Sequence, residues 1–207
     1  MTGPVDHVVT SGTFSLDGGT WDVDNNVWIV GDENEVIVVD AAHDLEKIAS
    51  GVAGRRVVAI VCTHGHDDHI DAAPALAERF GAPILLNPAE APLWDMRWPD
   101  RSPDGEIPES ISAGGVTLRA LVTPGHSPGS TCLYAPDLGT VFSGDTLFQG
   151  GPGATGRSYS SFDTIIDSIR STLLTLPPDT TVRTGHGDST SIGAEAPHLE
   201  EWIAKGS

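Results

Sequence analysis

The sequence has few cysteines and no long apolar run. Only Cys62 and Cys132 occur in 207 residues, and each stands in an apolar stretch, so a disulfide framework is not expected and both thiols are predicted in the core. A catalytic role for Cys62 is disfavoured because no neighbouring base or cation is evident to lower the pKa of its thiol. No segment has the apolar length needed to span a bilayer, and residues 1–11 lack the pattern of a cleavable export signal. We therefore expect a cytoplasmic protein that makes no contact with membranes.

Positive charge is also scarce. The chain has 11 basic and 29 acidic residues, which give a formal net charge of −18. Such a surface repels phosphate backbones, and no patch of lysine and arginine offsets it, so a nucleic-acid partner and a nuclease activity are disfavoured. We interpret the acidic excess as a solubilising surface. The hydrophobic content of 39% predicts a globular chain, organised as a single domain over residues 1–207.

Apolar runs and amphipathic spacing predict an α/β protein. Helices are expected over residues 44–53, 70–80, 161–176 and 196–204, and strands over residues 5–10, 21–30, 35–40, 57–62, 84–86, 116–122, 131–135, 140–143 and 181–184. This order suggests two similar halves, although no sequence repeat is visible. From residue 87 a short helix is predicted, followed by a long surface loop over residues 95–110, in a stretch that contains Trp94 and Trp98. A lid, an interaction surface and simple core packing all remain open for the two tryptophans.

One short motif is densely packed with potential metal ligands. His64, His66, Asp68 and His69 fall within six positions, directly after the apolar run of residues 57–61. Imidazole and carboxylate ligands suit zinc, iron or manganese, and the absence of nearby thiolates disfavours a structural zinc finger. The motif therefore predicts a metal site at the end of a buried strand.

Three further candidates follow strand-like runs, each in a turn that contains glycine. They are His126, Asp145 and His186. Glycine beside a ligand lets a loop approach a metal ion closely. The remaining histidines lack this setting and are predicted to be surface or structural residues: His7, His43 and His198.

Taken together, the motifs resemble the metallo-β-lactamase superfamily. The matching segments are Thr-His-Gly-His-Asp-Asp-His (63–69), Thr-Pro-Gly-His-Ser-Pro-Gly-Ser (123–130), Phe-Ser-Gly-Asp-Thr-Leu-Phe (142–148) and Thr-Gly-His (184–186). The second and third segments are most similar to glyoxalase II (hydroxyacylglutathione hydrolase) and its relatives. This resemblance implies a four-layer αββα sandwich with metal ions at one edge of the two sheets.

The resemblance also implies a ligand set. One metal ion would be held by His64, His66 and His126, and a second by Asp68, His69 and His186, with Asp145 bridging the two. Two divalent ions are implied, with zinc favoured and iron or manganese as alternatives. Asp68 would in addition orient the attacking hydroxide. Asp40, at the end of an interior strand, matches a position that orients a ligand histidine, and an ordinary strand-end acid is the alternative.

The chemistry implied by this site is hydrolysis of a small-molecule thioester. Two cations about 3.5–4 Å apart lower the pKa of a shared water, and the resulting bridging hydroxide attacks a carbonyl carbon. A thiolate leaving group, with a pKa near ~8.5, departs without a strong general acid. No protein nucleophile is then required.

Departures from glyoxalase II leave the thiol open. Only 21 residues follow His186, whereas glyoxalase II carries an added helical region there that helps to hold glutathione. Another small thiol, such as mycothiol, would also fit. Arg157 and Tyr159, in a glycine-rich loop, are predicted to hold a substrate carboxylate or amide, and a surface salt bridge of the arginine is the alternative.

Other activities remain possible from the motifs alone. A persulfide dioxygenase would use one iron held by His64, His126 and Asp145. A metallo-hydrolase acting on another ester or amide is a further alternative. A β-lactam hydrolase is disfavoured because Asp145 stands where those enzymes usually carry other residues, and a metal-stabilised binding module is disfavoured by the open character of the ligand set.

Overall fold

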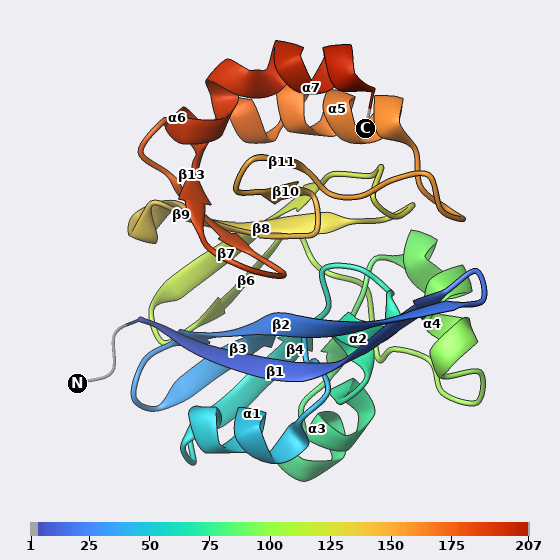
Figure 1. The fold of residues 1–207 in the computed structure, drawn as a ribbon. Helices are drawn as coiled ribbons and strands as arrows, with labels where there is room; N and C mark the ends of the chain where they lie inside the picture. Colours follow the sequence, from blue (N-terminus) through green and yellow to red (C-terminus); the bar gives the residue numbers. More distant parts are fainter. Residues whose placement is uncertain (1–3, 207) are drawn as a thin grey trace.

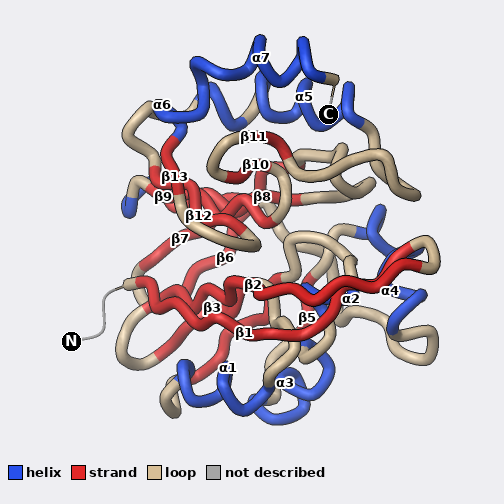
Figure 2. The backbone as a smooth tube through the Cα atoms, in the orientation of Figure 1, coloured by secondary structure: helices blue, strands red, loops and turns tan. Residues whose placement is uncertain are grey.

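Two mixed β-sheets pack face to face, and helices cover the outer face of each (Figures 1 and 2). The computed structural model describes residues 4–206. The first sheet has the strand order β1 (Val5–Leu16), β2 (Gly19–Gly31), β3 (Glu35–Val39), β4 (Arg56–Val61) and β5 (Ile84–Leu85). The second has the order β13 (Thr190–Ser191), β12 (Thr181–Thr184), β9 (Thr140–Gly144), β8 (Thr131–Ala135), β7 (Val116–Val122) and β6 (Ser110–Ala113). The predicted αββα sandwich is confirmed.

The helices divide between the two outer faces. In Figure 1, α1 (Leu45–Val52) and α3 (Ala73–Phe80) lie below the first sheet, whereas α5 (Phe162–Ser171) and α7 (Leu199–Lys205) lie above the second. The connections contain three short helices, α2 (Asp67–Ile70), α4 (Ala91–Arg97) and α6 (Ile192–Glu195). They also contain a small two-stranded sheet formed by β10 (Leu147–Phe148) and β11 (Gly151–Pro152). Among residues 4–206, no helix is both long and apolar enough to cross a membrane.

Strand β3 is buried on both faces of the first sheet. Val36 and Val38 belong to the core between the first sheet and the helices α1 and α3, whereas Ile37 and Val39 belong to the core between the two sheets. Successive residues of a strand point to opposite faces, so a strand covered on both faces must be apolar throughout. A third core, which includes Ile165 and Ile169, joins the second sheet to α5 and α7.

The helix predicted over residues 70–80 is in fact two elements. α2 ends at Ile70 and α3 begins at Ala73, with Pro74 in its first turn. The N–H of Ala72 donates to the Ala41 carbonyl, 3.0 Å away, instead of continuing a helix. Proline lacks an amide hydrogen and is best tolerated in a first helical turn, so the break falls before it. As a result the short α2 carries Asp68 and His69.

The segment around the predicted long loop is more ordered than expected. α4 extends to Arg97, three residues into the range predicted as loop. Trp94 is fully buried in the core between the first sheet and α3, and Trp98 packs against the same core. Core packing is therefore the correct interpretation of these tryptophans, not a lid.

Candidate metal centre

The ligand-rich turns meet at one edge of the sandwich because of strand direction. β3 and β4 are parallel, so the turns after Val39 and Val61 leave the first sheet on the same side. In the second sheet β9 and β12 are parallel, and β7 and β9 are each antiparallel to β8. The carboxyl ends of β7, β9 and β12 therefore lie at one edge, and the turns that follow them carry the last three candidates: His126, Asp145 and His186.

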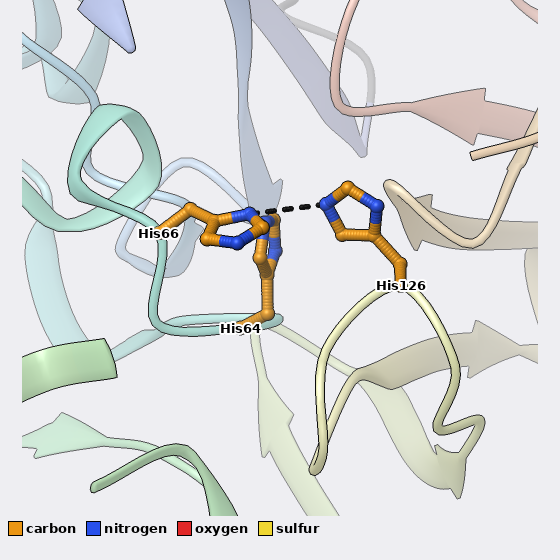
Figure 3. Close-up of side chains that lie close together, drawn as sticks. All are labelled: His64, His66 and His126. Atoms are coloured by element: carbon orange, nitrogen blue, oxygen red, sulfur yellow. Dashed lines mark hydrogen bonds between the residues drawn. The ribbon is translucent and has the colours of Figure 1, made fainter. Parts of the chain in front are cut away.

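Three imidazoles form the first group (Figure 3). His64 Nε2 and His126 Nε2 each lie 3.0 Å from Nδ1 of His66. His64 and His66 are buried, and His126 is only 8% exposed. The two loops approach from opposite sheets, so residues 62 positions apart contribute to the same point in space.

Hydrogen bonds fix which ring nitrogens are free in this group. His126 Nδ1 donates to the Ala154 carbonyl, 2.9 Å away, and a carbonyl can only accept. Thr63 Oγ1 donates to Asp40, so it accepts from His64 Nδ1 at 3.1 Å. In the neutral rings both Nε2 atoms then present lone pairs, and the single Nδ1 of His66 can satisfy only one of them with a proton. Converging lone pairs of this kind suit a cation.

Asp68, His69 and His186 form a second group beside the first. The Nε2 atoms of His69 and His186 are 3.2 Å apart, and Asp68 Oδ2 lies 3.5 Å and 3.3 Å from them, respectively. His69 Nδ1 donates to Asp40, and His186 Nδ1 donates to the Asp24 carbonyl at 2.7 Å. Again the Nε2 atoms of the two rings are turned toward each other.

Asp145 lies between the two groups. Its Oδ1 is 3.3 Å from His69 Nε2, and its Oδ2 is 3.3 Å from His186 Nε2 and 3.6 Å from His126 Nε2. A Cβ at Gly185 would stand only 2.1 Å from Asp145 Oδ1, so only glycine lets the chain pass this close to the carboxylate. The structure thus brings together all seven candidates from four separate segments.

The site passes a chemical test for divalent cations. Asp145 Oδ1 is buried and makes no hydrogen bond within residues 4–206. Buried polar atoms normally have a hydrogen-bond partner, so an unpaired carboxylate oxygen among converging ring nitrogens favours a binding site for a cation. Five imidazoles and two carboxylates are also the ligand types that zinc and iron accept.

Electrostatics separate the two groups of histidines. Burial lowers the pKa of His66 to about 3 and that of His64 well below its usual range, and neighbouring imidazoles add to the effect. Burial opposes ionisation of His186 as well, but the carboxylates of Asp145 and Asp68 raise its pKa to about 10. Burial would raise the pKa of Asp145, yet the imidazoles of His186 and His69 hold it well below its usual range. The first group is thus a set of neutral imidazoles, whereas in the second group ionised carboxylates face protonated imidazoles.

A cavity of about 210 Å³ opens onto both groups. Phe14 and Phe148 form its apolar walls, and the Phe14 ring packs 5.0 Å from the ring of His66. Arg157 also lines it, and its guanidinium lies 4.1 Å over the ring of Trp21. Tyr159 has a positive φ of 68° within a tight turn and is 46% exposed, so the structure brings Arg157 but not Tyr159 to the cavity wall.

Asp40 lies where the resemblance places it. Its carboxylate accepts hydrogen bonds from His69 Nδ1 (3.0 Å), Thr63 N–H (2.7 Å) and Thr63 Oγ1 (2.8 Å). A strand-end acid without such contacts would be the alternative, and the geometry does not support it. An orienting partner of this kind fixes both the tautomer and the direction of an imidazole.

Sequence reasoning missed Asn25. Its Nδ2 donates to Asp68 Oδ2 at 3.0 Å, and its Oδ1 lies 2.9 Å from His43 Nε2, so His43 supports the site indirectly. The available signal was the pair Asn25–Asn26 inside an otherwise strand-like run, where asparagine is normally depleted. His7 stacks on Trp28 and His198 lies beside Glu201, away from the cluster, in line with the structural and surface roles expected of them.

The two cysteines are inert core residues. Both are fully buried, and burial raises the pKa of the Cys62 thiol well above its usual range and that of Cys132 to about 11. A thiol that stays protonated is a poor nucleophile, so Cys62 has no catalytic role here.

Comparison with known proteins agrees with this geometry. The sequence model of the metallo-beta-lactamase superfamily matches residues 20–186. An uncharacterized protein of Aquifex aeolicus is 37% identical over 185 residues, covering 82% of this chain and 88% of its own. The probable metallo-hydrolase YqgX of Bacillus subtilis is 32% identical, covering 82% and 88%, and the hydroxyacylglutathione hydrolase GloC of Haemophilus influenzae is 32% identical, covering 79% and 85%.

Solved structures share the fold. The B3 metallo-beta-lactamase BLEG-1 superposes with a TM-score of 0.77 at 29% identity, covering 92% of this chain and 98% of that one. TTHA1623, crystallised in a di-iron-bound form, superposes with a TM-score of 0.71 at 32% identity, covering 84% and 93%. With seven convergent side chains at the sheet edge and a family match over most of its length, the chain belongs to the metallo-β-lactamase superfamily.

Proposed function

We propose that this protein is a dinuclear metal-dependent hydrolase of small-molecule thioesters. The observation that carries the proposal is the convergence of seven side chains on two adjoining groups that share Asp145. His64, His66 and His126 would hold one ion, and Asp68, His69 and His186 the other. Divalent ions bound there, zinc in the first place and iron or manganese as alternatives, supply an activated water and a Lewis acid for a carbonyl oxygen.

The protein's own groups then position the reactants. Asp68 lines the cavity and is held by Asn25, so its carboxylate is placed to orient the attacking water. Its pKa falls to about 2: burial opposes this, and the imidazole of His69 and the hydrogen bond with His186 outweigh it. The Asp68 carboxylate therefore stays ionised throughout the physiological pH range and can accept a hydrogen bond from a water molecule.

A thioester is the best match to the residues around the site. A thiolate leaves without a strong general acid, and every carboxylate that lines the cavity has a lowered pKa, so none would serve as one. The similarity to a hydroxyacylglutathione hydrolase supports the same substrate class. An acyl group of modest size would contact the apolar walls of Phe14 and Phe148.

Arg157 is the candidate contact for the thiol part of the substrate. It is a cation at the cavity wall, stacked on Trp21 and lying 5.3 Å from the ring centroid of Phe14, in a protein of strongly negative net charge. A guanidinium fixed on aromatic rings is well suited to a carboxylate. We assign Arg157 to an anionic group of the thiol carrier, and Arg157→Gln is expected to raise KM for carboxylate-bearing thioesters with little change in kcat.

Metal analysis combined with a substrate panel tests the proposal. Two zinc ions per chain and turnover of acyl-thioesters built on different small thiols are the expected results. One iron per chain with oxygen uptake on a persulfide would overturn it in favour of a dioxygenase. Turnover confined to oxygen esters, amides or β-lactams would refute the thioester assignment but leave the assignment of a hydrolase activity intact.

A further inference from the structure

A fully buried carboxylate lies behind the first group of histidines. Glu90 stands in the 3₁₀ turn Pro88–Glu90, just before α4, and its side chain has no solvent exposure. An isolated buried carboxylate is costly unless several donors satisfy it. The donors that surround Glu90 therefore indicate what it is for.

Each oxygen of Glu90 binds a different ligand-bearing loop. Oε2 accepts the N–H of Gly65 at 2.7 Å. Oε1 accepts the hydroxyl of Ser127 at 2.7 Å and the N–H of Gly129. Gly65 separates His64 from His66 in the chain, and Ser127 directly follows His126. One carboxylate thus links the two loops that supply all three ring nitrogens of the first group.

The second group is held by other residues. Asp40 orients His69, Asn25 holds Asp68, and the Asp24 carbonyl orients His186. None of these three contacts involves Glu90. Loss of the Glu90 contacts should therefore affect the first group much more than the second.

We propose that Glu90 is a positioning residue for the first metal group, which sets the distance between the His64–His66 loop and the His126 loop. This inference rests on the proposed function, because it presumes that the histidines bind metal. Glu90 touches neither substrate nor a ring nitrogen, so its effect is indirect. Groups that orient ligands in this way typically change metal affinity by about 10- to 100-fold when they are altered.

Glu90→Gln is the sharpest test. The amide keeps the size of the side chain but replaces one acceptor oxygen by a donor, which then faces either the Gly65 N–H or the Gly129 N–H and Ser127 hydroxyl. We expect zinc affinity, measured by chelator competition on the metal-depleted protein, to fall about 10- to 100-fold for one of two ions and to stay unchanged for the other. The visible absorption of the Co²⁺-loaded protein should change in parallel.

Asp32→Asn is the matched control. Asp32 accepts the N–H groups of Asn34 and Glu35 in the turn between β2 and β3, at the opposite end of the first sheet. The same chemical change there should leave both zinc affinities and the Co²⁺ spectrum unaltered. If Glu90→Gln does not fold, Ser127→Ala removes one of the three donors and should still weaken one ion selectively.

The outcomes separate the two proposals. A wild-type protein that binds no divalent metal refutes the proposed function and, with it, the inference. If the wild-type protein binds two ions and the Glu90→Gln variant binds both with wild-type affinities, the positioning role alone is refuted. The same result in Ser127→Ala refutes it if Glu90→Gln does not fold. Equal weakening of both ions would also overturn it, because that result indicates a general loss of structure.

Discussion

Asp40 Oδ2 lies 3.0 Å from His69 Nδ1, and the backbone of Asp40 adopts a positive φ of 57° to place it there. A left-handed conformation is uncommon for a residue other than glycine and costs free energy. The same carboxylate accepts two bonds from Thr63, which itself lies against His64. One strained residue therefore orients a histidine of each group, at the point where β3 and β4 end side by side.

Replacing Asp40 by asparagine should weaken metal binding without unfolding the protein. Asparagine tolerates the left-handed region, so the backbone is preserved, but its amide nitrogen cannot accept a hydrogen bond. We expect metal affinity to fall about 10- to 100-fold, measured by chelator competition. Affinity equal to that of the wild type would show that the contact with His69 does not orient the ring.

The variant His66→Ala should lose turnover and stay folded. His66 Nδ1 is the atom to which both other nitrogens of the first group point, so its removal leaves two donors in that group. Circular dichroism should remain that of the wild type, while the metal content falls by about one ion per chain, as expected for a three-ligand site that loses a ligand. Unchanged activity would refute the assignment of the site.

Much of the site could be predicted from sequence because its ligands follow buried strands. The apolar runs before His64 and Asp145 mark strands that are largely buried on both faces, and His186 follows a shorter strand that runs parallel to the one before Asp145. Parallel strands of one sheet end at a common edge. Of the two predicted substrate contacts, Arg157 lines the cavity and Tyr159 does not. For the residues that follow strands a local pattern was enough, because the topology of the sheets supplied the long-range part.

The supporting residues could not be predicted in the same way. Glu90 lies 25 residues from Gly65 and 37 from Ser127, and nothing in its neighbours distinguishes it from a surface acid. The hairpin of β1 and β2 was underestimated because residues 11–16 mix small and polar side chains, and its length depends on pairing with residues 19–24. Contacts between distant segments decided these features, and local periodicity carries little information about them.

Gly185→Ala should disrupt the site although a single methyl group is added. The new Cβ would stand 2.1 Å from Asp145 Oδ1 and 2.8 Å from the ring of His69, so the carboxylate between the two groups must move. We expect metal content to fall sharply and thermal stability to change less, since the two shortest contacts are with ligand side chains and only the third, at 3.1 Å, is with the backbone of Gly144. Gly187→Ala, where nothing lies within 4 Å of the added atom but φ is 65°, is the backbone control: it should cost stability and leave metal content intact.

Hydrogen bonds join the β1–β2 turn to the loop that carries Arg157. Asp17 Oδ2 accepts the N–H of Ser158 at 2.9 Å, and Oδ1 accepts its hydroxyl at 2.7 Å. These hydrogen bonds hold the pKa of Asp17 below its usual range. Because the folded-state pKa is lowered, the contact is fully present above the unfolded pKa of about 3.9 and is lost as pH falls through the lower, folded value.

Hydrogen exchange at the Ser158 amide measures this contact directly. Its protection should be constant from neutral pH down to about pH 4 and should decrease at lower pH, where Asp17 becomes protonated. Asp17→Asn keeps a residue that tolerates the positive φ of 52° and should reduce protection already at neutral pH. The Ile60 amide, bonded to the Pro83 carbonyl in the first sheet, reports on global unfolding in the same sample. Equal protection of Ser158 in the variant and the wild type would show that Asp17 does not hold the loop, and the stacking of Arg157 on Trp21 would then have to account for its position.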